Sequence, residues 1–327
     1  MHKGGGRLRD GLTMRASAFA LWGIVLAIAA GALLLAPGYD AGGWSADARI
    51  SLSDLSTVDN VPPYKPDTSR LRFAVAAVLS PRATIENYQM LASYLSARLN
   101  RPVEIVQSKS YAETNSLVRS GDAALALVCS GAFVAGRQDF GMQPLVVPVV
   151  SGQTTYHSYL IVRSTSTIRS WDDLRHKRFA FTDPLSNSGR LVPVFLLSRK
   201  GETPEKFFDD FIFTYSHDKS VQAVADGLVD AAAVDSLVYD FMVQNVPSLT
   251  SRVKVIWVSP PYGINPVVVN PNIAQGLRSE LESIFLGMHT DPEGQKVLAQ
   301  LGIDSFRTPD PRAYDSIEAM FQATAVR

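Results

Sequence analysis

Short apolar runs alternate with amphipathic stretches from residue 71 onward. The run LRFAVAAV (71–78) has the length and composition of a buried strand. The next stretch, 84–99, carries apolar residues three and four positions apart, the spacing of one helix face: Ile85, Tyr88, Ala92, Leu95 and Leu99. The sequence therefore predicts a strand followed by a helix that packs through one face.

The alternation continues to the end of the chain. Further strands are expected at 103–108, 123–128, 144–150, 157–163, 179–182, 211–216, 230–236, 253–259 and 265–270. Further helices are expected at 110–120, 190–200, 218–226, 273–289, 292–301 and 311–323. Strands that alternate with helices at this spacing form parallel sheets covered by helices on both faces, so the predicted fold class is α/β.

The strand–helix pattern occurs twice, which predicts two α/β lobes. If the chain crosses between them near 144–163 and 253–270, lobe 1 comprises 70–155 and 256–327, and lobe 2 comprises 156–255. Ligands of open α/β sheets bind beyond the carboxyl ends of the strands. Two such sheets facing each other predict a ligand cleft between hinged lobes.

An uncharged apolar run, 16–36, precedes the lobes, and residues 1–15 before it are basic, as on the cytoplasmic side of a membrane helix. About 20 apolar residues span a bilayer, which favours an inner-membrane anchor. A start at Met14 would instead give the short basic leader of a cleaved signal peptide. Both alternatives stay open, and each exports the body to the periplasm. Residues 37–69, rich in Gly, Pro, Ser and Asp, are expected to form a flexible tether or a pro-segment.

The composition restricts the classes of partner. The 31 Lys and Arg residues balance 31 Asp and Glu residues, so there is no electrostatic reason to expect a nucleic acid. A single cysteine excludes a disulfide within the chain and a cysteine zinc site. The five histidines show no ligand spacing, so neither a metal site nor a cofactor is expected. With 327 residues, the chain is longer than one hydrophobic core usually spans.

Polar residues follow several predicted strands at the points where helices are expected to begin. These residues are Thr84, Cys129, Ser130, Gly131, Ser186, Asn187, Ser188 and His217. Helix N-termini offer unpaired N–H groups and a partial positive charge, which bind a phosphate-like group without Lys or Arg. His217 beside such an anion would be a pH-sensitive donor. Helix capping and turn chemistry explain the same Ser and Asn residues, and that alternative stays open.

Three stretches resemble the phosphate/phosphite/phosphonate ABC-transporter substrate-binding family. They are GDAALALVCSGAFVAG (121–136), FAFTDPLSNSGRLVPVFLL (179–197) and YSHDKSVQAVADGLVDAAAVDS (215–236). The second contains Asp-Pro-x-Ser-x-Ser-Gly-x-x-x-Pro, and the third contains Ser-His-Asp before a helix that ends in Gly-x-Val-Asp-Ala-Ala. The Tyr-x-Ser pair at Tyr156 and the segment SPPYGINP (259–266) also look familial.

The resemblance covers roughly residues 70–310 and implies a two-lobed type II periplasmic binding protein fold with a hinge, here preceded by an N-terminal apolar helix. It implies a ligand held by the Ser186–Ser188 turn and His217. Together with the residues at the other strand ends, the expected ligand contacts are Thr84, Cys129, Ser130, Gly131, Tyr156, Ser158, Ser186, Asn187, Ser188, His217 and Asp235.

Two departures from the family pattern bear on the ligand. Ser236 and Asn265 are neutral where binders of aminophosphonates would need carboxylates, although Asp235 remains a candidate partner for an amine. Cys129 is expected at a helix N-terminus, which lowers the pKa of a thiol, and a soft thiolate suits arsenite better than phosphate. An arsenite-sensing subgroup of the family is similar in having a pocket cysteine. A small buried hydrophobe is the other interpretation of this residue.

The sequence thus predicts a periplasmic solute-binding protein, not an enzyme, that captures a phosphonate, phosphite or phosphate type of oxyanion for an ABC transporter permease. The alternative is an arsenite-binding sensory protein that uses Cys129 and signals through a separate membrane sensor kinase. A more remote alternative is a hydrolase with Ser188, His217 and either Asp235 or Asp183 as its triad, although the chain lacks G-x-S-x-G.

Overall fold

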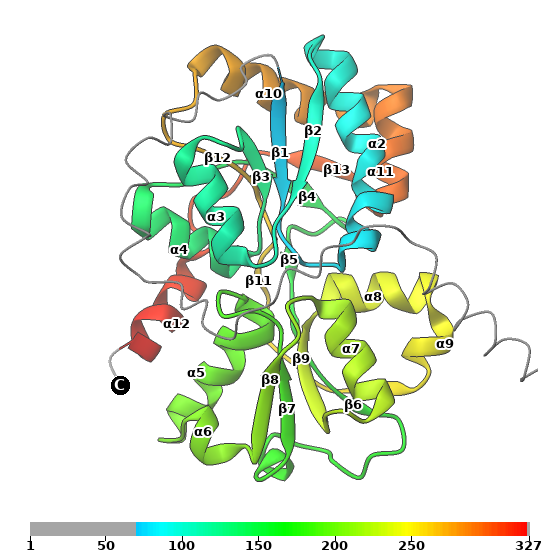
Figure 1. The fold of residues 1–327 in the computed structure, drawn as a ribbon, viewed down its shortest axis with the longest axis vertical. Helices are drawn as coiled ribbons and strands as arrows, with labels where there is room; N and C mark the ends of the chain where they lie inside the picture. The colour runs from blue at the N-terminus through cyan, green and yellow to red at the C-terminus, as the bar shows by residue number, and fades with distance from the viewer. Residues whose placement is uncertain (1–69, 326–327) are drawn as a thin grey trace, which may run out of the picture. The chain divides into compact units, whose positions relative to one another are not determined.

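Two sheets organise residues 70–325, the part of the chain that this computed structural model describes. Among these residues, six strands form the first sheet, in the order β13 (Ser305–Arg307), β4 (Gln143–Val149), β12 (Val267–Val269), β3 (Leu125–Leu127), β1 (Leu71–Val75) and β2 (Val103–Gln107). Five other strands of the described residues form the second sheet, in the order β10 (Val253–Val258), β6 (Ser158–Arg163), β9 (Ala231–Asp235), β7 (Arg178–Phe181) and β8 (Asp210–Phe213). Figure 1 shows the first sheet in the upper half and the second in the lower half.

The chain passes between the two sheets twice. β4 leads through β5 (Thr155–Tyr156) into β6, and β10 leads back through β11 (Tyr262–Gly263) into β12. β5 and β11 pair with each other in antiparallel fashion, with Tyr262 opposite Tyr156. The two connections therefore run side by side between the sheets (Figure 1).

Both sheets are mixed, so the prediction of parallel sheets is confirmed for part of each sheet only. β1 pairs in parallel with β2 and β3, and β7 pairs in parallel with β8 and β9. β12 and β6, however, run antiparallel to their neighbours β3 and β9. These are the strands that enter each sheet directly from the other one. Because they begin at the edge where the parallel strands end, they run in the opposite direction. β13, which pairs antiparallel with β4, is also reversed.

Helices cover both faces of each sheet. Around the first sheet lie α2 (Pro81–Leu99), α3 (Tyr111–Ser120), α4 (Ser130–Phe140), α10 (Gln275–Gly287) and α11 (Pro292–Leu301). Around the second lie α5 (Val192–Arg199), α6 (Pro204–Phe207), α7 (His217–Asp226), α8 (Ser236–Asn245) and α9 (Pro247–Thr250). The last helix, α12 (Asp315–Ala325), packs against both α4 and α5 through Ile317 and Met320. Single 3₁₀ turns occur at Asp172–Leu174 and Met288–Thr290.

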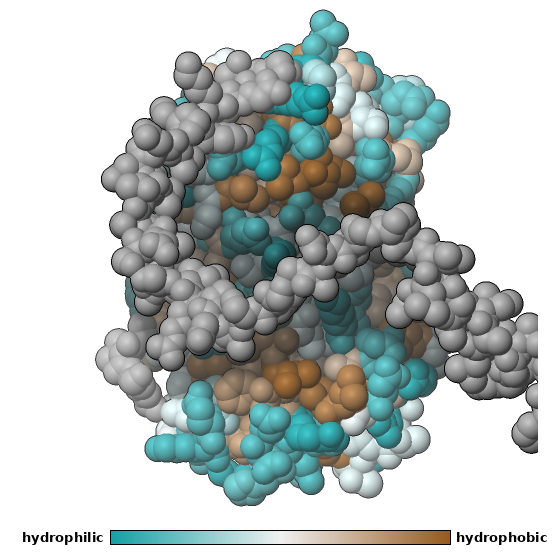
Figure 2. All heavy atoms as spheres, viewed as in Figure 1, coloured by the Kyte–Doolittle hydropathy of each residue, from teal (hydrophilic) through white to brown (hydrophobic). Residues whose placement is uncertain are grey.

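Apolar side chains fill both faces of each sheet. On the first sheet, α2 contributes Leu91 and Leu95 to one face, and α4 contributes Phe133 to the other. The stripe predicted for 84–99 is therefore correct at its centre, but Ile85 at its start is exposed. On the face drawn in Figure 2, hydrophilic residues gather at the lower end, beyond the second sheet, and apolar residues lie nearer the middle.

The predictions for residues 1–15, 16–36 and 37–69 lie outside the described residues. Within 70–325, no helix combines the length and the apolar character needed to cross a bilayer. The residue boundaries of the two lobes stay a prediction. β10 continues in the second sheet to Val258, so the boundary expected after residue 255 falls inside this strand.

Candidate functional site

Three hydrogen bonds join the two halves of the molecule at the carboxyl ends of their parallel strands. The N–H of His217 donates to the carbonyl of Val78 at 3.0 Å. The N–H of Ser80 donates to the Asp218 carboxylate at 3.1 and 3.2 Å. The N–H of Tyr111 donates to Oδ2 of Asp183 at 3.0 Å. The loops after β1 and before α3 therefore contact the loops after β7 and β8.

Gly131 lies at a tight contact between the two halves. A Cβ added to this residue would lie 2.4 Å from the carbonyl oxygen of Leu185 and 2.8 Å from the backbone nitrogen of Asn187. Both atoms belong to the backbone and cannot rotate away, so only glycine fits here. The start of α4 is thus in contact with the π-helical turn Asn187–Leu191, which precedes α5. As predicted, these two helix starts converge.

Five buried side-chain atoms at this junction have no hydrogen-bond partner among the described residues. They are the hydroxyl of Tyr111, Oδ1 of Asn187, Oγ of Ser188, Oγ of Ser216 and Nε2 of His217, and we refer to them as the polar cradle. The five residues are at most 1% exposed. A buried polar atom without a partner costs roughly 1–3 kcal/mol in proteins. Several such atoms in one place indicate a site that a polar ligand completes.

The second sheet holds Ser188 and His217 next to each other. Ser158 and Asp235 face each other across the β6–β9 pair. Oγ of Ser158 donates to the carbonyl of Ser188 at 2.7 Å, and the N–H of Asp235 donates to Nδ1 of His217 at 3.1 Å. One cross-strand pair therefore positions two members of the cradle. Ser158, which the sequence predicted as a ligand contact, uses its hydroxyl to hold the Ser188 turn.

His217 is a neutral donor in this environment. Burial lowers its pKa to about 3, an effect that the nearby Asp218 carboxylate partly offsets. Its Nδ1 accepts the N–H of Asp235, so the ring proton is on Nε2, the atom that faces the cradle. The buried ring is therefore uncharged at neutral pH in the ligand-free protein, and the expectation of a pH-sensitive donor beside a bound anion stays a prediction.

A hydrogen-bonded chain forms one wall of the cradle. The hydroxyl of Tyr156 bonds to Oγ of Ser130 at 2.7 Å and accepts Nδ2–H of Asn187 at 3.0 Å. Oδ1 of Asn265 accepts the N–H of Ser130 at 3.0 Å, and Nδ2 of Asn265 donates to Oδ2 of Asp235 at 3.1 Å. This wall fixes the orientation of the Asn187 amide, so that its carbonyl oxygen is the atom left to the cradle.

Asp235 is fully buried and caps the N-terminus of α8. Burial raises its pKa to about 6, although hydrogen bonds from the Leu237 amide and Asn265 act in the opposite direction. Its carboxylate oxygens are thus occupied by α8 and by Asn265.

Cys129 lies at the N-cap of α4, as the sequence predicted, but the expected effect on its thiol is wrong. The thiol is fully buried, and burial raises its pKa. The backbone N–H groups of Asn187 and Gly131 act against this rise but do not reverse it. The desolvation of a fully buried thiolate outweighs the helix N-terminus, so the thiol stays protonated at neutral pH.

Two predicted contacts use their hydroxyls within their own loops. Oγ of Ser186 accepts the N–H of Gly189 at 3.0 Å and caps the turn that follows. Oγ1 of Thr84 donates to the carbonyl of Leu79 at 3.3 Å. The helix-capping alternative is therefore correct for Ser186. Its neighbours Asn187 and Ser188 instead contribute unpartnered atoms to the cradle.

The sequence did not indicate Tyr111 and Ser216 as members of the site. Tyr111 is the first residue of α3 and belongs to the apolar cluster beneath it, so its sequence position indicates a core aromatic. Ser216 precedes α7 in the position of an N-cap, but it makes no side-chain cap bond. The sequence feature that could have indicated Ser216 is its position directly before His217 in the Ser-His-Asp motif.

The geometry contradicts a Ser-His-Asp triad. In a triad, Nδ1–H of the histidine donates to the carboxylate. Here Nδ1 of His217 accepts a backbone N–H, and its other neighbour is the hydroxyl of Thr182 at 3.1 Å. The carboxylates of Asp235 and Asp183 accept backbone N–H groups elsewhere, so neither orients the ring. The residues considered for the hydrolase alternative therefore do not form its catalytic unit.

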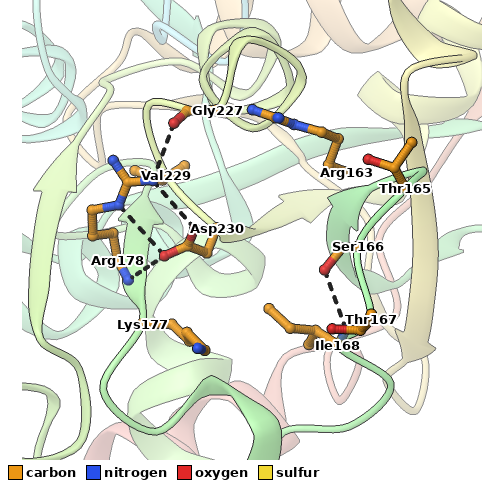
Figure 3. A pocket seen from close by; sticks show the side chains of 10 residues that line it. All are labelled: Arg163, Thr165, Ser166, Thr167, Ile168, Lys177, Arg178, Gly227, Val229 and Asp230. Carbon is orange, nitrogen blue, oxygen red and sulfur yellow. Dashed lines mark hydrogen bonds and ion pairs between the residues drawn. The ribbon is translucent and has the colours of Figure 1, made fainter.

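Two of the cavities on the described part of the chain bear on the site. One, of about 490 Å³, lies between the two halves and shares Tyr156, Asp235 and Asn265 with the wall of the cradle. The other, of about 480 Å³, lies at the far end of the second sheet, where Arg178 pairs with Asp230 at 3.2 Å (Figure 3). It shares no residue with the predicted site. Within residues 70–325, no group of His, Cys, Asp and Glu has the arrangement of a metal site.

Residues 73–314 match the family of periplasmic substrate-binding proteins of phosphonate ABC transporters. The chain belongs to this family. The match spans both sheets and all members of the cradle. Two solved structures share the fold of this chain, which is the mixed α/β fold of type II periplasmic binding proteins.

Two curated relatives match this chain over part of its length. It is 31% identical over 160 residues to the phosphonates-binding periplasmic protein of Escherichia coli (strain K12), covering 48% of this chain and 47% of the relative. It is 28% identical over 165 residues to the probable ABC transporter phosphite binding protein PhnD1 of Prochlorococcus marinus (strain MIT 9301), covering 49% and 56%. The chain thus spans about half the length of the curated relatives it matches.

Two solved structures resemble this chain in fold. The binding protein component of an ABC phosphonate transporter from Pseudomonas aeruginosa has a TM-score of 0.75 at 23% identity, covering 79% of this chain and 87% of that one. PhnD1 from Prochlorococcus marinus in complex with methylphosphonate has a TM-score of 0.70 at 21% identity, covering 78% and 97%.

Proposed function

We propose that this protein captures a small phosphorus oxyanion, of the phosphonate or phosphite type, in the polar cradle and delivers it to an ABC importer. The observation that carries the proposal is the set of five unpartnered buried atoms between the two sheets. Four of them belong to groups that donate hydrogen bonds: the three hydroxyls and Nε2 of His217. The relatives named for phosphonate and phosphite support this class of ligand.

The cradle suits an oxyanion in which one oxygen is still protonated. Oδ1 of Asn187 is an acceptor among donors, so it pairs with an O–H of the ligand while the other groups bind its charged oxygens. No Lys or Arg belongs to the cradle, and backbone N–H groups at the starts of α4 and α7 add the favourable field. Neutral donors of this kind bind an anion without leaving an unpaired positive charge in the free protein.

Ligand binding is proposed to stabilise closure of the two halves. The hydrogen bonds Ser80–Asp218, His217–Val78 and Tyr111–Asp183 exist only when the halves are in contact. A ligand that bridges Tyr111 on one side and Ser188 and His217 on the other would favour that state through its differential affinity. The segments β5 and β11 are proposed as the hinge, since they are the connections between the sheets.

The partner and the location follow from the same proposal. We expect a periplasmic protein that presents its closed form to a transporter permease, with residues 16–36 serving as an inner-membrane anchor or as a signal peptide. The arsenite-sensing alternative has no specific observation in its favour. The Cys129 thiol is buried with a raised pKa, and the relatives described above are named for phosphonate and phosphite.

Titration calorimetry with a panel of phosphite, methylphosphonate, phosphate, sulfate and arsenite tests the proposal. We expect tight binding of phosphite or methylphosphonate and no heat from arsenite. Ser188→Ala should weaken the binding roughly tenfold or more, because it removes a hydrogen bond to a charged ligand. The matched control Ser93→Ala, on the exposed side of α2, should not. Binding of arsenite alone, or equal effects of the two variants, would refute the proposal.

A further inference from the structure

Thr182 joins the two loops that carry most of the polar cradle. It directly follows β7 and is fully buried. Four of the five cradle residues belong to this half of the molecule. Two loops carry them: Asn187 and Ser188 lie in the turn after β7, and Ser216 and His217 lie at the start of α7. Thr182 bonds to both loops.

The backbone of Thr182 bonds to one neighbour in each loop. Its N–H donates to the carbonyl of Gly189 at 3.3 Å, and its carbonyl accepts the N–H of Tyr215 at 2.7 Å. Gly189 directly follows Ser188, and a Cβ added to it would lie 2.4 Å from Oγ1 of Thr182, so the turn packs on the threonine side chain. Tyr215 directly precedes Ser216 and has a φ of 59°, a left-handed conformation that is unfavourable for a tyrosine. The bond to Thr182 therefore helps to hold the chain in the turn that leads to Ser216.

The hydroxyl of Thr182 makes the contact that bears on the ligand. Its oxygen lies 3.1 Å from Nδ1 of His217 and 3.4 Å from Oγ of Ser220. Ser220 has a closer partner, the hydroxyl of Thr214 at 2.6 Å. Nδ1 of His217 already accepts the N–H of Asp235, so this nitrogen carries no proton and the Thr182 hydroxyl is the donor. Two donors thus point at Nδ1, and both require the tautomer with its proton on Nε2.

A donor at Nδ1 affects the opposite nitrogen of the imidazole ring. Hydrogen bonds to Nδ1 draw electron density from the ring and make Nε2–H a stronger donor, because hydrogen bonds in a chain polarise one another. They also fix which nitrogen carries the proton and the direction in which that N–H points. Nε2 of His217 is the cradle atom that has no partner within residues 70–325. The Thr182 hydroxyl therefore influences what the ring offers to an oxyanion.

We propose that Thr182 is a positioning residue for anion binding: its hydroxyl donates to Nδ1 of His217 and thereby strengthens and aims the Nε2–H group that binds the oxyanion. Its backbone bonds hold the two cradle loops next to that ring. The inference rests on the proposed function, because the ligand is the oxyanion of that proposal. The bond between Thr182 and His217, however, can be measured without a ligand.

Calorimetry of the full chain with methylphosphonate compares three variants. Thr182→Val keeps the shape of the side chain and removes the hydroxyl, so we expect it to weaken binding roughly fivefold. Thr182→Ser keeps the hydroxyl, so its affinity should stay within about twofold of that of the wild type. Thr250→Val is the matched control, because Thr250 is a buried threonine of the same half that bonds only within and next to α9. This control should leave the affinity unchanged.

Nitrogen-15 NMR of the ligand-free protein tests the bond itself. In the wild type, the Thr182 hydroxyl proton should exchange slowly and show a scalar coupling to Nδ1 of His217. Thr182→Val should shift the Nδ1 resonance, whereas Thr182→Ser should keep it near its wild-type position. A purely structural role of Thr182 would not give this rescue by serine. The wild-type spectrum needs no variant, so the bond is tested even if Thr182→Val does not fold.

The two measurements separate the inference from the proposed function. If methylphosphonate binds Thr182→Val as tightly as the wild type, or if Thr250→Val weakens it equally, the inference is wrong and the proposed function stands. The same holds if serine does not restore the affinity, or if the Thr182 hydroxyl proton couples to an atom other than Nδ1. If the wild type binds neither phosphite nor methylphosphonate, the proposed function fails, and the role of Thr182 in binding fails with it.

Discussion

Nδ1 of His217 lies 3.1 Å from the backbone nitrogen of Asp235 and accepts its N–H. The two side chains are both fully buried, and burial moves their pKa values in opposite directions. The pKa of His217 falls from 6.5 to about 3, and that of Asp235 rises from 3.8 to about 6. Burial disfavours the charged form of each, which is the imidazolium in one case and the carboxylate in the other.

These shifts make opposite contributions to the pH dependence of stability. For His217 the unfolded state binds more protons, so its contribution is complete above pH 6.5 and is lost as the pH falls toward about 3. For Asp235 the folded state binds more protons, so its contribution is complete below pH 3.8 and is lost as the pH rises through about 6. Between about pH 4 and pH 6, the slopes that the two groups give to the unfolding free energy against pH are opposite and cancel.

Substitution of either residue should therefore leave the pH dependence that the other one gives to the unfolding free energy. Relative to the wild type, the unfolding free energy of Asp235→Asn should rise with pH by about 1.4 kcal/mol per unit between about pH 4 and pH 6. That of His217→Gln should fall by a similar amount over the same range. Urea denaturation at a series of pH values measures both slopes. If both variants keep the wild-type pH dependence, the opposite pKa shifts of the two groups are wrong.

Ser188 and Ser186 should respond differently to replacement by alanine. Oγ of Ser188 is buried without a partner, so Ser188→Ala should leave the unfolding free energy of the ligand-free protein unchanged or raise it by about 1 kcal/mol. Oγ of Ser186 caps the turn before α5, so Ser186→Ala should lower it by about 1 kcal/mol. Thermal or urea denaturation distinguishes them. A loss of stability in Ser188→Ala equal to that in Ser186→Ala would give both hydroxyls a structural role.

Gly131→Ala should prevent full closure of the two halves. The added methyl group would meet the backbone of Leu185 and Asn187 at distances that atoms do not tolerate. We expect the radius of gyration in small-angle scattering to stay larger than that of the wild type at saturating methylphosphonate, and the affinity to fall. Gly276→Ala, where the new Cβ meets nothing within 4 Å, is the control. A variant as compact and as tight-binding as the wild type would contradict the closed contact at Gly131.

The Cys129 thiol should resist alkylation in the native protein. It is fully buried and its pKa is raised, whereas iodoacetamide reacts with an accessible thiolate. Mass spectrometry should show no modification of the folded protein at neutral pH and complete modification in guanidinium chloride. Rapid native alkylation would reveal an exposed, ionised thiol and would restore the case for a thiophilic ligand.

The sequence predicted most helices and strands, because local periodicity follows burial on one face. It missed α8, since Ser236–Asn245 contains apolar residues around much of its circumference and shows no single stripe. It missed β13, where only Phe306 of three residues is buried. The reversed direction of β6 and β12 follows from the crossings between sheets, which no local pattern records.

Residues of the candidate site could be predicted where a motif marks a helix start. They could not be predicted where tertiary packing brings a distant residue to the site. Asn187, Ser188 and His217 follow strands in recognisable motifs, and all three contribute unpartnered atoms. Tyr111 joins them from a distant helix, and its position in the chain resembles that of any core aromatic. The pKa of Cys129 depends on its degree of burial, which the sequence does not contain.

Nitrogen-15 NMR of the His217 ring tests the central claim most directly, with His217→Gln to assign its signals. We predict the Nε2–H tautomer at neutral pH in the free protein, with a large shift of the Nε2 resonance and a slowly exchanging Hε2 proton once methylphosphonate saturates the protein. A ring protonated at Nδ1, or an Nε2 resonance that methylphosphonate leaves unchanged at saturation, would contradict a cradle in which this atom binds the oxyanion.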